Sequence, residues 1–597
     1  MYCMNKIKSI IFILKYYLKA TPAYLFIYYV QVILNALIFV VNSIYKLRIV
    51  FNAFESRIEL YFILTQLLLI IATNILLMLF NTWFKRKYSP KCELTVQEKI
   101  QKDLFSKATE INLRYYDDNN FYDNYILALR ESESIGKSIL TNTGNILFNI
   151  VSISTITAIL FTIDLKIVGL ILFSVFLGFI VDIKIAKKQA NKDFETIKYN
   201  RKLDYYKRVF YLYDHIEEMK SIRSIDFLFN DYAETYSTLR DINKQCCKPL
   251  VKLNALKGIM ESILTSFSVY FLLIYKLVIT KTISIGDFSA SLSSIWRLSD
   301  QMTQLVGNVS GLYKGSIYCS KIIEFLNIDT LRLKSDNEKR LLPTPKEAKE
   351  IKIQNLYFSY DGKKNVLEDI NLTIEPRQKI AIVGRNGSGK TTLIKIILGL
   401  YNNYQGNILL DNERIDSYNP LQLRDYFSCL FQDFQIYATT LEKNIYMDNV
   451  TNEDTSRILN VIKQVGFEDK FKTLPNGLQT IVLQEYDENA IRLSGGENQK
   501  VALARILLSK SCIVILDEPS SALDPLAERD FNNLLLSAFD DRTVILISHR
   551  LFTTQNADKI FLLSNGKLEE QGTHDFLMNL NGEYAYMYKI QKEKFLL

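Results

Sequence analysis

Long apolar runs alternate with charged segments over the first half of the chain. A helix needs roughly 20 predominantly apolar residues to cross a bilayer. Six runs approach this requirement, although the fifth carries Glu261 and Lys276 near its ends and the sixth is more polar. They cover about residues 22–45, 59–83, 140–162, 165–183, 256–279 and 284–312. The pattern predicts an all-α transmembrane domain of six spans within residues 1–328.

The sixth run contains Arg297, Asp300, Gln301 and Gln304. Polar groups inside a span are costly, so they usually face protein or a water-filled cavity. We interpret this run as a span that faces an aqueous path. Two alternatives stay open: the polar groups pair between helices, or the second half of the run has already left the membrane.

Basic residues follow several of the apolar runs, for example Lys85-Arg86-Lys87. This is the positive-inside pattern, and it predicts that segments 84–139 and 184–255 are cytoplasmic. Their apolar residues recur at helical spacing, so the spans should continue into the cytoplasm as long helices. The connections 46–58, 163–165 and 280–283 should then be short external loops. With six spans, both termini are expected on the cytoplasmic side of the cytoplasmic membrane.

Residues 5–19 form an amphipathic segment with Lys6, Lys8, Lys15 and Lys19, which predicts a helix on the cytoplasmic membrane surface. The charged residues 329–349 include Pro343 and Pro345 and have the composition of a linker. After them the pattern changes to short β-rich runs separated by helical stretches. Residues 350–597 are therefore predicted to form an α/β domain with an antiparallel start and a hairpin at Asn565-Gly566.

The net charge of +8 comes from 72 Lys and Arg against 64 Asp and Glu. The basic residues flank apolar runs and do not form a stripe interleaved with aromatics, which argues against nucleic acid as a partner. The 7 cysteines have no metal-ligand spacing, and the 3 histidines are too scattered for a zinc site.

One glycine-rich segment matches the phosphate-binding pattern G-x-x-x-x-G-K-[ST], with a strand-like run before it and a helical run after it. In such a loop, backbone N–H groups and a helix N-terminus converge on phosphate oxygens. Lys390 is expected to reach the β- and γ-phosphates of ATP, and Thr391 to hold Mg²⁺. The expected nucleotide-binding residues here are Gly384, Arg385, Asn386, Gly387, Ser388, Gly389, Lys390, Thr391 and Thr392.

The apolar run 513–516 ends in two carboxylates, Asp517 and Glu518. More than 120 residues after a phosphate-binding loop, this arrangement suits an ATPase. Asp517 is expected to hold the Mg²⁺ shell, and Glu518 to polarise the attacking water.

A second phosphate-binding device precedes these acids. Ser494, Gly495, Gly496 and Glu497 follow Leu493 and open a helical stretch. If the two devices lie at opposite ends of the domain, one chain cannot bring both to the same γ-phosphate. The sequence therefore predicts that the ATP site is completed by a second chain.

In order and spacing, these motifs resemble the nucleotide-binding domain of ATP-binding cassette (ABC) transporters. The resemblance implies that Tyr360 stacks on adenine and that Gln432 contacts Mg²⁺ or water. Asp524, in Ser521-Ala522-Leu523-Asp524, falls on the D-loop of that family, and His549 on its switch histidine. Lys390, Gln432, Glu518 and His549 are then the expected catalytic residues, with Thr391, Gln432 and Asp517 around the metal.

Six spans before one cassette resemble an exporter-type half-transporter. Residues 113–132 and 206–227 are similar to the intracellular loops of bacterial peptide and multidrug exporters, whose short helices dock on the cassettes. The resemblance implies ATP-driven export by a homodimer or heterodimer in a lipid membrane, with a peptide such as a bacteriocin or signalling peptide as the preferred substrate. A lipid flippase or multidrug exporter is the alternative, and a non-transporting sensor or regulatory ATPase is an alternative of another class.

Two places depart from the family pattern. Residues 483–492, LQEYDENAIR, lack the usual glycine-containing pattern that senses the partner's membrane loop. The signature reads LSGGE where LSGGQ is commoner, so Glu497 is expected to add negative charge near an ATP site. The departure leaves the choice between homodimer and heterodimer open.

Overall fold

The computed structural model describes residues 2–56, 60–163, 165–222, 225–328, 347–448, 450–519 and 538–596. The chain divides into two compact units. The first comprises Met1–Thr109 and Tyr122–Ile328, and the second Glu110–Phe121 and Asp329–Leu597. Most of the predicted linker lies outside the described residues. Residues 110–121, predicted within the membrane half, group with the cassette.

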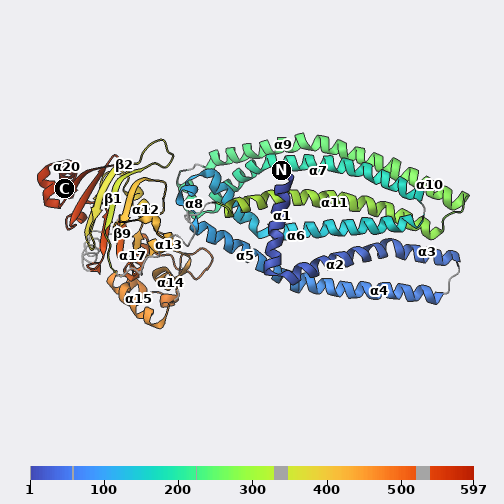
Figure 1. Ribbon diagram of the computed structural model, residues 1–597, viewed down its shortest axis with the longest axis horizontal. Helices are drawn as coiled ribbons and strands as arrows, with labels where there is room; N and C mark the ends of the chain where they lie inside the picture. Colours follow the sequence, from blue (N-terminus) through green and yellow to red (C-terminus); the bar gives the residue numbers. More distant parts are fainter. Residues whose placement is uncertain are drawn as a thin grey trace. The chain divides into compact units, whose positions relative to one another are not determined.

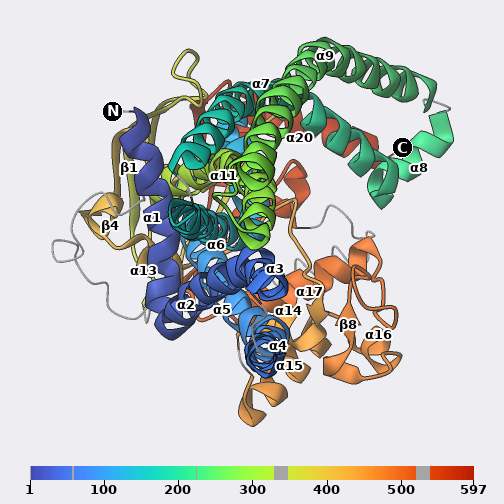
Figure 2. The ribbon, with the colours of Figure 1, turned by 90° about the vertical axis from the view of Figure 1, so that its right-hand side faces the viewer.

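The first unit is a bundle of long helices (Figure 1). Its α-helices are α1 (Tyr2–Ala20), α2 (Pro22–Val40), α3 (Lys46–Ser56), α4 (Leu60–Trp83), α5 (Ser89–Glu110), α6 (Asn119–Phe161), α7 (Leu165–Tyr211), α8 (Tyr213–Ile222), α9 (Ile225–Met260), α10 (Tyr270–Ile274) and α11 (Ile285–Leu326). Short π-helical turns join several of them: η1 (Val41–Tyr45), η2 (Phe84–Tyr88), η4 (Glu261–Val269) and η5 (Tyr275–Ile279). Figures 1 and 2 show α1 on the outside of the bundle, crossing the direction of α6 and α7.

Four stretches of described helix are long and apolar enough to cross a membrane: Pro22–Asn52, Tyr61–Glu110, Asn124–Phe161 and Val168–Tyr211. They include most of each of the first four predicted spans. The fifth predicted span contains the shorter apolar helix Phe267–Ile279, and the sixth falls in α11, which is not among the four. The total of six spans therefore stays a prediction. Residues 46–56, predicted as part of a loop, continue the first helix as α3.

The long helical extensions predicted from helical spacing are present in α6 and α7. α6 has 43 residues and α7 has 47, about twice what a bilayer requires. Amide pairs join α2 and the following turn η1 to α4: Asn42 of η1 and Asn74 exchange hydrogen bonds of 2.7 and 2.9 Å, and Asn81 donates to Asn35 of α2 at 2.8 Å. From the first pair to the second, the residue number falls on one helix and rises by the same amount on the other. This is the register of two antiparallel helices.

The polar residues of the sixth run pair within the bundle. The Arg297 guanidinium lies 5.2 Å from the centre of the Phe39 ring, and Gln304 donates to Asp300 at 3.0 Å. Gln301 is buried. Nearby, Lys257 donates to both oxygens of Asp182 at 2.8 and 2.9 Å. These contacts match the alternative of pairing between and along helices. They do not require an aqueous path.

The second unit contains two main sheets. An antiparallel sheet has the order β2-β1-β4-β5, from β1 (Ile351–Phe358), β2 (Leu367–Ile374), β4 (Gln405–Leu410) and β5 (Glu413–Arg414). A mostly parallel sheet has the order β12-β11-β3-β10-β9-β6, from β3 (Lys379–Val383), β6 (Phe427–Leu430), β9 (Ile513–Asp517), β10 (Thr543–Ile547), β11 (Lys559–Ser564) and β12 (Lys567–Gly572). A small third sheet pairs β7 (Thr439–Thr440) with β8 (Ile481–Val482).

Helices and helical turns surround these sheets: η3 (Leu113–Asp117), α12 (Lys390–Ile397), η6 (Ile415–Ser417), α13 (Pro420–Asp425), α14 (Leu441–Tyr446), α15 (Asn452–Gln464), α16 (Glu468–Lys472), η7 (Gly477–Gln479), α17 (Gly495–Leu508), η8 (Leu551–Thr554), α19 (His574–Leu580) and α20 (Glu583–Leu596). The predicted hairpin is present: Asn565 and Gly566 have φ of 49° and 79° and join β11 to antiparallel β12. The fold class predicted from the sequence is confirmed in its order, helical half first and α/β half second.

Candidate functional site

The carboxyl ends of four parallel strands carry the predicted site residues. In register, Ile547 of β10 lies beside Ile382 of β3 and Asp517 of β9. Because neighbouring parallel strands end at the same edge, the glycine loop after β3, the acids of β9 and the histidine loop after β10 meet there. Gln432 follows β6 at this edge, and its side chain is exposed.

The glycine loop has a backbone that only glycine can adopt at two positions. Gly384 has φ of 150°, and a Cβ there would lie 2.1 Å from the carbonyl oxygen of Leu563. Gly389 has φ of 103°, and a Cβ there would lie 2.7 Å from Leu367. Within the described structure the buried Ser388 hydroxyl has no hydrogen-bond partner. A buried polar atom without a partner is costly, so this hydroxyl is suited to a ligand's phosphate oxygen.

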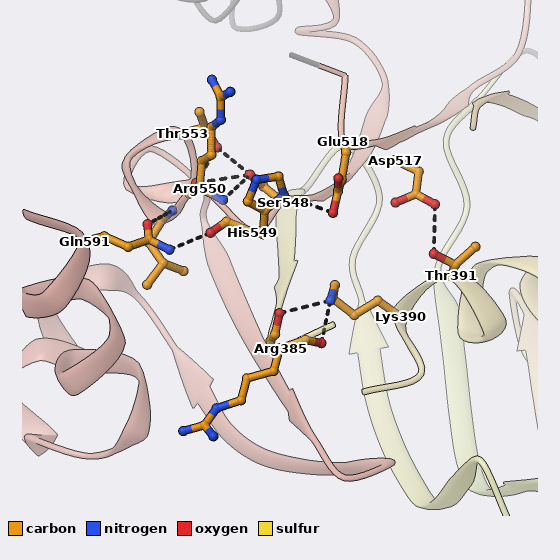
Figure 3. A network of polar contacts seen from close by, with 12 residues as sticks. Arg385, Lys390, Thr391, Asp517, Glu518, Ser548, His549, Arg550, Thr553 and Gln591 are labelled. Atoms are coloured by element: carbon orange, nitrogen blue, oxygen red, sulfur yellow. Dashed lines mark hydrogen bonds and ion pairs between the residues drawn. The ribbon is translucent and has the colours of Figure 1, made fainter. Parts of the chain in front are cut away.

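Lys390 and Thr391 begin α12 directly after this loop. The Lys390 Nζ donates to the carbonyl oxygens of Gly384 and Arg385 at 2.9 and 3.0 Å (Figure 3). Burial lowers the pKa of Lys390, and the carboxylates of Glu518 and Asp517 oppose this shift. An ammonium held here by two carbonyl oxygens can exchange them for phosphate oxygens, which carry more negative charge.

Thr391 and Asp517 form an oxygen pair. The Thr391 hydroxyl donates to Asp517 Oδ2 at 3.0 Å. Burial raises the pKa of Asp517, although the hydrogen bond from Thr391 lowers it. A bound divalent cation would relieve that burial penalty, and hydroxyl and carboxylate oxygens are ligands that Mg²⁺ accepts. The residues present thus fit Mg²⁺ together with phosphate oxygens.

Glu518 and His549 face each other across the end of the sheet (Figure 3). Glu518 Oε1 lies 3.0 Å from His549 Nδ1. Glu518 has φ of 50°, a left-handed conformation that is uncommon outside glycine and asparagine. Such strain tends to persist where function requires a side chain in a particular direction. It turns Glu518 away from the line of β9 and toward the histidine loop.

Tyr360 lies at the rim of the same loop. Its hydroxyl is 2.9 Å from Thr392 Oγ1, and its ring packs edge-on against Phe358 and Tyr401, with centroids 4.9 and 5.5 Å apart. The residue is 38% exposed, so part of the ring is accessible to a base. Asp524, predicted from the D-loop resemblance, lies outside the described residues.

The signature segment starts helix α17. The Ser494 hydroxyl accepts from the N–H of Glu497, and Glu497 accepts from the N–H of Ser494 at 2.7 Å, which completes a capping box. Lys470 lies 3.3 Å from Glu497. Burial alone would raise the pKa of Glu497, but the Ser494 N–H and the Lys470 ammonium together lower it. Glu497 therefore caps the start of α17, and the Lys470 ammonium offsets its negative charge.

The two phosphate-binding devices belong to different hydrophobic cores. α12, which follows the glycine loop, packs in a cluster with β1, β2 and β4. α17, which follows Ser494, packs in a second cluster with α14 and α15. Gly495 and Gly496 begin α17, and a Cβ on Gly495 would meet no atom within 4 Å. The signature thus presents an open surface.

The resemblance to exporter loops implied that a short helix within residues 113–132 docks on a cassette, and η3 does contact it: Leu113 N donates to Leu400 O at 3.3 Å, and Tyr401 donates to Asp117 at 2.8 Å. Sequence reasoning missed Gln591 of α20, which contacts the histidine loop. This is a long-range contact of an ordinary polar residue, and no spacing in the sequence signals it.

A family model, several curated proteins and a solved structure match this chain. The family model for the ABC transporter domain matches residues 367–521. An ATP-dependent lipid A-core flippase of Coxiella burnetii is 31% identical over 389 residues, covering 62% of this chain and 64% of that protein. A lipid A-core flippase of Pseudomonas fluorescens is 34% identical over 307 residues, covering 51% and 49%. The mitochondrial iron-sulfur clusters transporter ATM1 of Kluyveromyces lactis is 31% identical over 385 residues, covering 63% and 52%.

These matches span about half to two thirds of the length of the curated relatives. A solved structure described as a bacterial Atm1-family ABC exporter with ATP bound covers 96% of this chain and 99% of its own, with a TM-score of 0.79 at 20% identity. At that identity the likeness shows the fold. The chain therefore contains an ABC transporter domain over residues 367–521 and has the fold of an ABC exporter.

Proposed function

We propose that this chain is one half of a dimeric membrane ATPase that exports an amphiphilic substrate, with a lipid as the favoured class. One observation carries the proposal: Lys390, the Thr391–Asp517 pair and the Glu518–His549 pair converge at one edge of a sheet, in a chain with four apolar helices long enough to span a membrane. Both termini and the cassette are proposed to be cytoplasmic, where ATP is present.

The site suits ATP with Mg²⁺. Gly384 and Gly389 leave the backbone open to close approach, and Lys390 can turn its ammonium from two carbonyl oxygens toward the β- and γ-phosphates. Mg²⁺, held by Thr391 and Asp517 with Gln432 nearby, would neutralise the charge that develops on the phosphates. Tyr360 offers the accessible part of its ring to adenine.

Hydrolysis is proposed to depend on positioning and charge. Glu518 is the group placed to orient and polarise the attacking water, because its backbone strain directs the carboxylate into the site. His549, 3.0 Å from Glu518, can hydrogen-bond both that carboxylate and a phosphate oxygen. Lys390 stabilises negative charge in the transition state. No covalent intermediate is needed.

A second chain is proposed to complete each ATP site. Ser494 and the two following glycines lie at the start of α17, in a different core from the glycine loop. In a dimer, the signature of one chain would close over ATP held by the other. Every catalytic element is present here, and Glu497 is neutralised by a cap and by Lys470. We therefore favour a homodimer over a heterodimer.

The substrate class is the part of the proposal that differs from the sequence-based preference. The relatives described above are named for lipid A-core and for iron-sulfur clusters, and none of these names contains a peptide. A lipid therefore has more support than the bacteriocin or signalling peptide that the loop segments favoured. A multidrug exporter, and a sensor that moves nothing, remain as competing hypotheses for the experiment.

ATPase activity of the purified protein in lipid nanodiscs tests these alternatives. Turnover should rise when an amphiphilic lipid is added and should stay unchanged with unrelated peptides. Stimulation by peptides alone would overturn the lipid assignment. ATP turnover that does not change with lipids, peptides or drugs, together with no uptake of any of them into inside-out vesicles, would favour the sensor.

A further inference from the structure

We propose that Gln591 is a positioning residue that fixes the backbone of the histidine loop and thereby the catalytic direction of His549. The proposal rests on the proposed ATPase function. Gln591 lies in α20, 42 residues after His549 in the sequence. Its Nε2 donates to the carbonyl oxygen of His549 at 2.6 Å, and its Oε1 accepts from the N–H of Leu551 at 2.9 Å (Figure 3).

The two bonds form a clamp because they use both ends of one amide. A carbonyl and an N–H two residues apart are held at a fixed separation, as in a strand pairing. Within the loop, Thr553 and Ser548 hydrogen-bond to each other and to Arg550, and these bonds maintain its local shape. Gln591 adds a connection from the loop to another element. The backbone from which the His549 imidazole reaches Glu518 is thereby held in place.

α20 is itself held firmly, so the clamp has a rigid base. Tyr584 is fully buried and Tyr588 nearly so, in a core with Leu551, Val383 and Leu577. The Glu570 carboxylate accepts from the N–H groups of Glu583 and Tyr584 at 2.6 and 3.3 Å and caps the helix. Residues 584, 588 and 591 share one helix face, since they are four and seven positions apart. Gln591 thus ends an apolar stripe that faces the domain.

The position of α20 also explains why the clamp bears on catalysis. At its first residue, Glu583 lies 3.4 Å from Arg385 of the glycine loop. That pair is exposed and contributes little energy. At its ninth residue, Gln591 holds the loop whose His549 contacts Glu518. One helix therefore spans both sides of the nucleotide site, and its stronger contact is on the histidine side.

Steady-state ATP hydrolysis by the full-length protein in nanodiscs tests the clamp. Gln591→Ala should lower kcat roughly ten-fold and leave KM for ATP within about two-fold, because the loss of an interaction that acts in the transition state lowers kcat. Lys592→Ala is the matched control, since Lys592 is an exposed neighbour on the same helix. The kcat of Lys592→Ala should stay within about two-fold of the wild-type value. Equal kcat for wild type and Gln591→Ala would overturn the proposal.

A second variant separates positioning from helix stability. Gln591→Glu keeps size and can accept from Leu551, but its ionised carboxylate cannot donate to the His549 carbonyl. Because the pKa of a glutamate is ordinarily about 4.3, this carboxylate is ionised at pH 7, and kcat should fall about as far as in Gln591→Ala. His549, Arg550, Tyr588 and Lys592 are the titratable or charged groups around this position, and they are common to both proteins. Wild-type kcat in Gln591→Glu would contradict the clamp.

Hydrogen exchange provides a readout that does not depend on turnover. The Leu551 amide should exchange faster in Gln591→Ala than in wild type and Lys592→Ala. If wild type hydrolyses no ATP, the proposed function fails, yet exchange at Leu551 still decides whether the clamp exists. If wild type hydrolyses ATP and Leu551 exchanges equally in all three proteins, the clamp fails alone.

Discussion

Replacement of Glu497 tests whether the unusual signature glutamate is a structural cap or an impairment of the ATP site. Two contacts are at stake: the bond to Ser494 N and the ion pair with Lys470. Glutamine is the commoner residue at this position of the signature, and Glu497→Gln retains the cap while removing the charge. Glu497→Ala removes both contacts.

The structure sets the size of each effect. Loss of the hydrogen bond from the Ser494 N–H to Glu497 costs about 0.5–1.5 kcal/mol. The ion pair, with side chains 32% and 25% exposed, contributes about 0.2–1 kcal/mol. Glu497→Ala should therefore weaken the start of α17 by roughly 0.7–2.5 kcal/mol, and Glu497→Gln by less than about 1 kcal/mol. At about 1.4 kcal/mol per factor of ten, exchange in residues 494–499 should rise at least about three-fold with alanine and by a smaller factor with glutamine.

The pKa of Glu497 adds a pH signature. Since the folded pKa is lowered, the cap stabilises α17 above the unfolded pKa of about 4.3 and loses its effect as pH falls through the folded value. ATPase turnover should stay within about three-fold in Glu497→Gln, with roughly unchanged KM. If Glu497→Gln hydrolyses ATP several-fold faster than wild type and hydrogen exchange at residues 494–499 is unaltered, the capping role is refuted. The glutamate would then impair the ATP site.

Three further predictions follow from the cassette. Glu518→Gln should lower phosphate release by at least about 100-fold and leave ATP binding intact in a filter-binding assay; wild-type turnover would contradict the assignment. Gly384→Ala should weaken ATP binding more than about 100-fold, because the added Cβ meets Leu563 O at 2.1 Å; unchanged affinity would remove the glycine loop from the site. Tyr401→Phe should speed hydrogen exchange at residues 112–117 by about five- to ten-fold, since it deletes the 2.8 Å bond to Asp117; equal exchange would mean that η3 is held by other contacts.

The sequence predicted most of the cassette because its signals are local. A glycine loop between a strand and a helix, or Asn565-Gly566 between two apolar strands, restricts φ and ψ within a few residues. The same holds for the acids that end β9. Parallel strands then bring Lys390, Asp517 and His549 to one edge without further information.

The parts that were missed depend on long-range packing. Gln591 has no special spacing, and its partners become visible only when α20 is placed against the histidine loop. Residues 110–121 read as a continuation of the membrane half, but Asp117 bonds to Tyr401 and the segment groups with the cassette. From the sequence, Glu497 was expected to add negative charge near ATP. Its contacts with Ser494 and Lys470, which show that it caps the helix, are visible only in the structure.

The central claim is that ATP hydrolysis at this site drives export of an amphiphilic lipid. The most direct measurement follows a headgroup-labelled lipid in sealed proteoliposomes, with ATP and Mg²⁺ outside and a membrane-impermeant quencher as the probe of sidedness. The account predicts that the protected fraction of label changes with time in wild type and stays at the no-ATP level in Glu518→Gln. Equal movement in both proteins, or movement that does not need ATP, would contradict it.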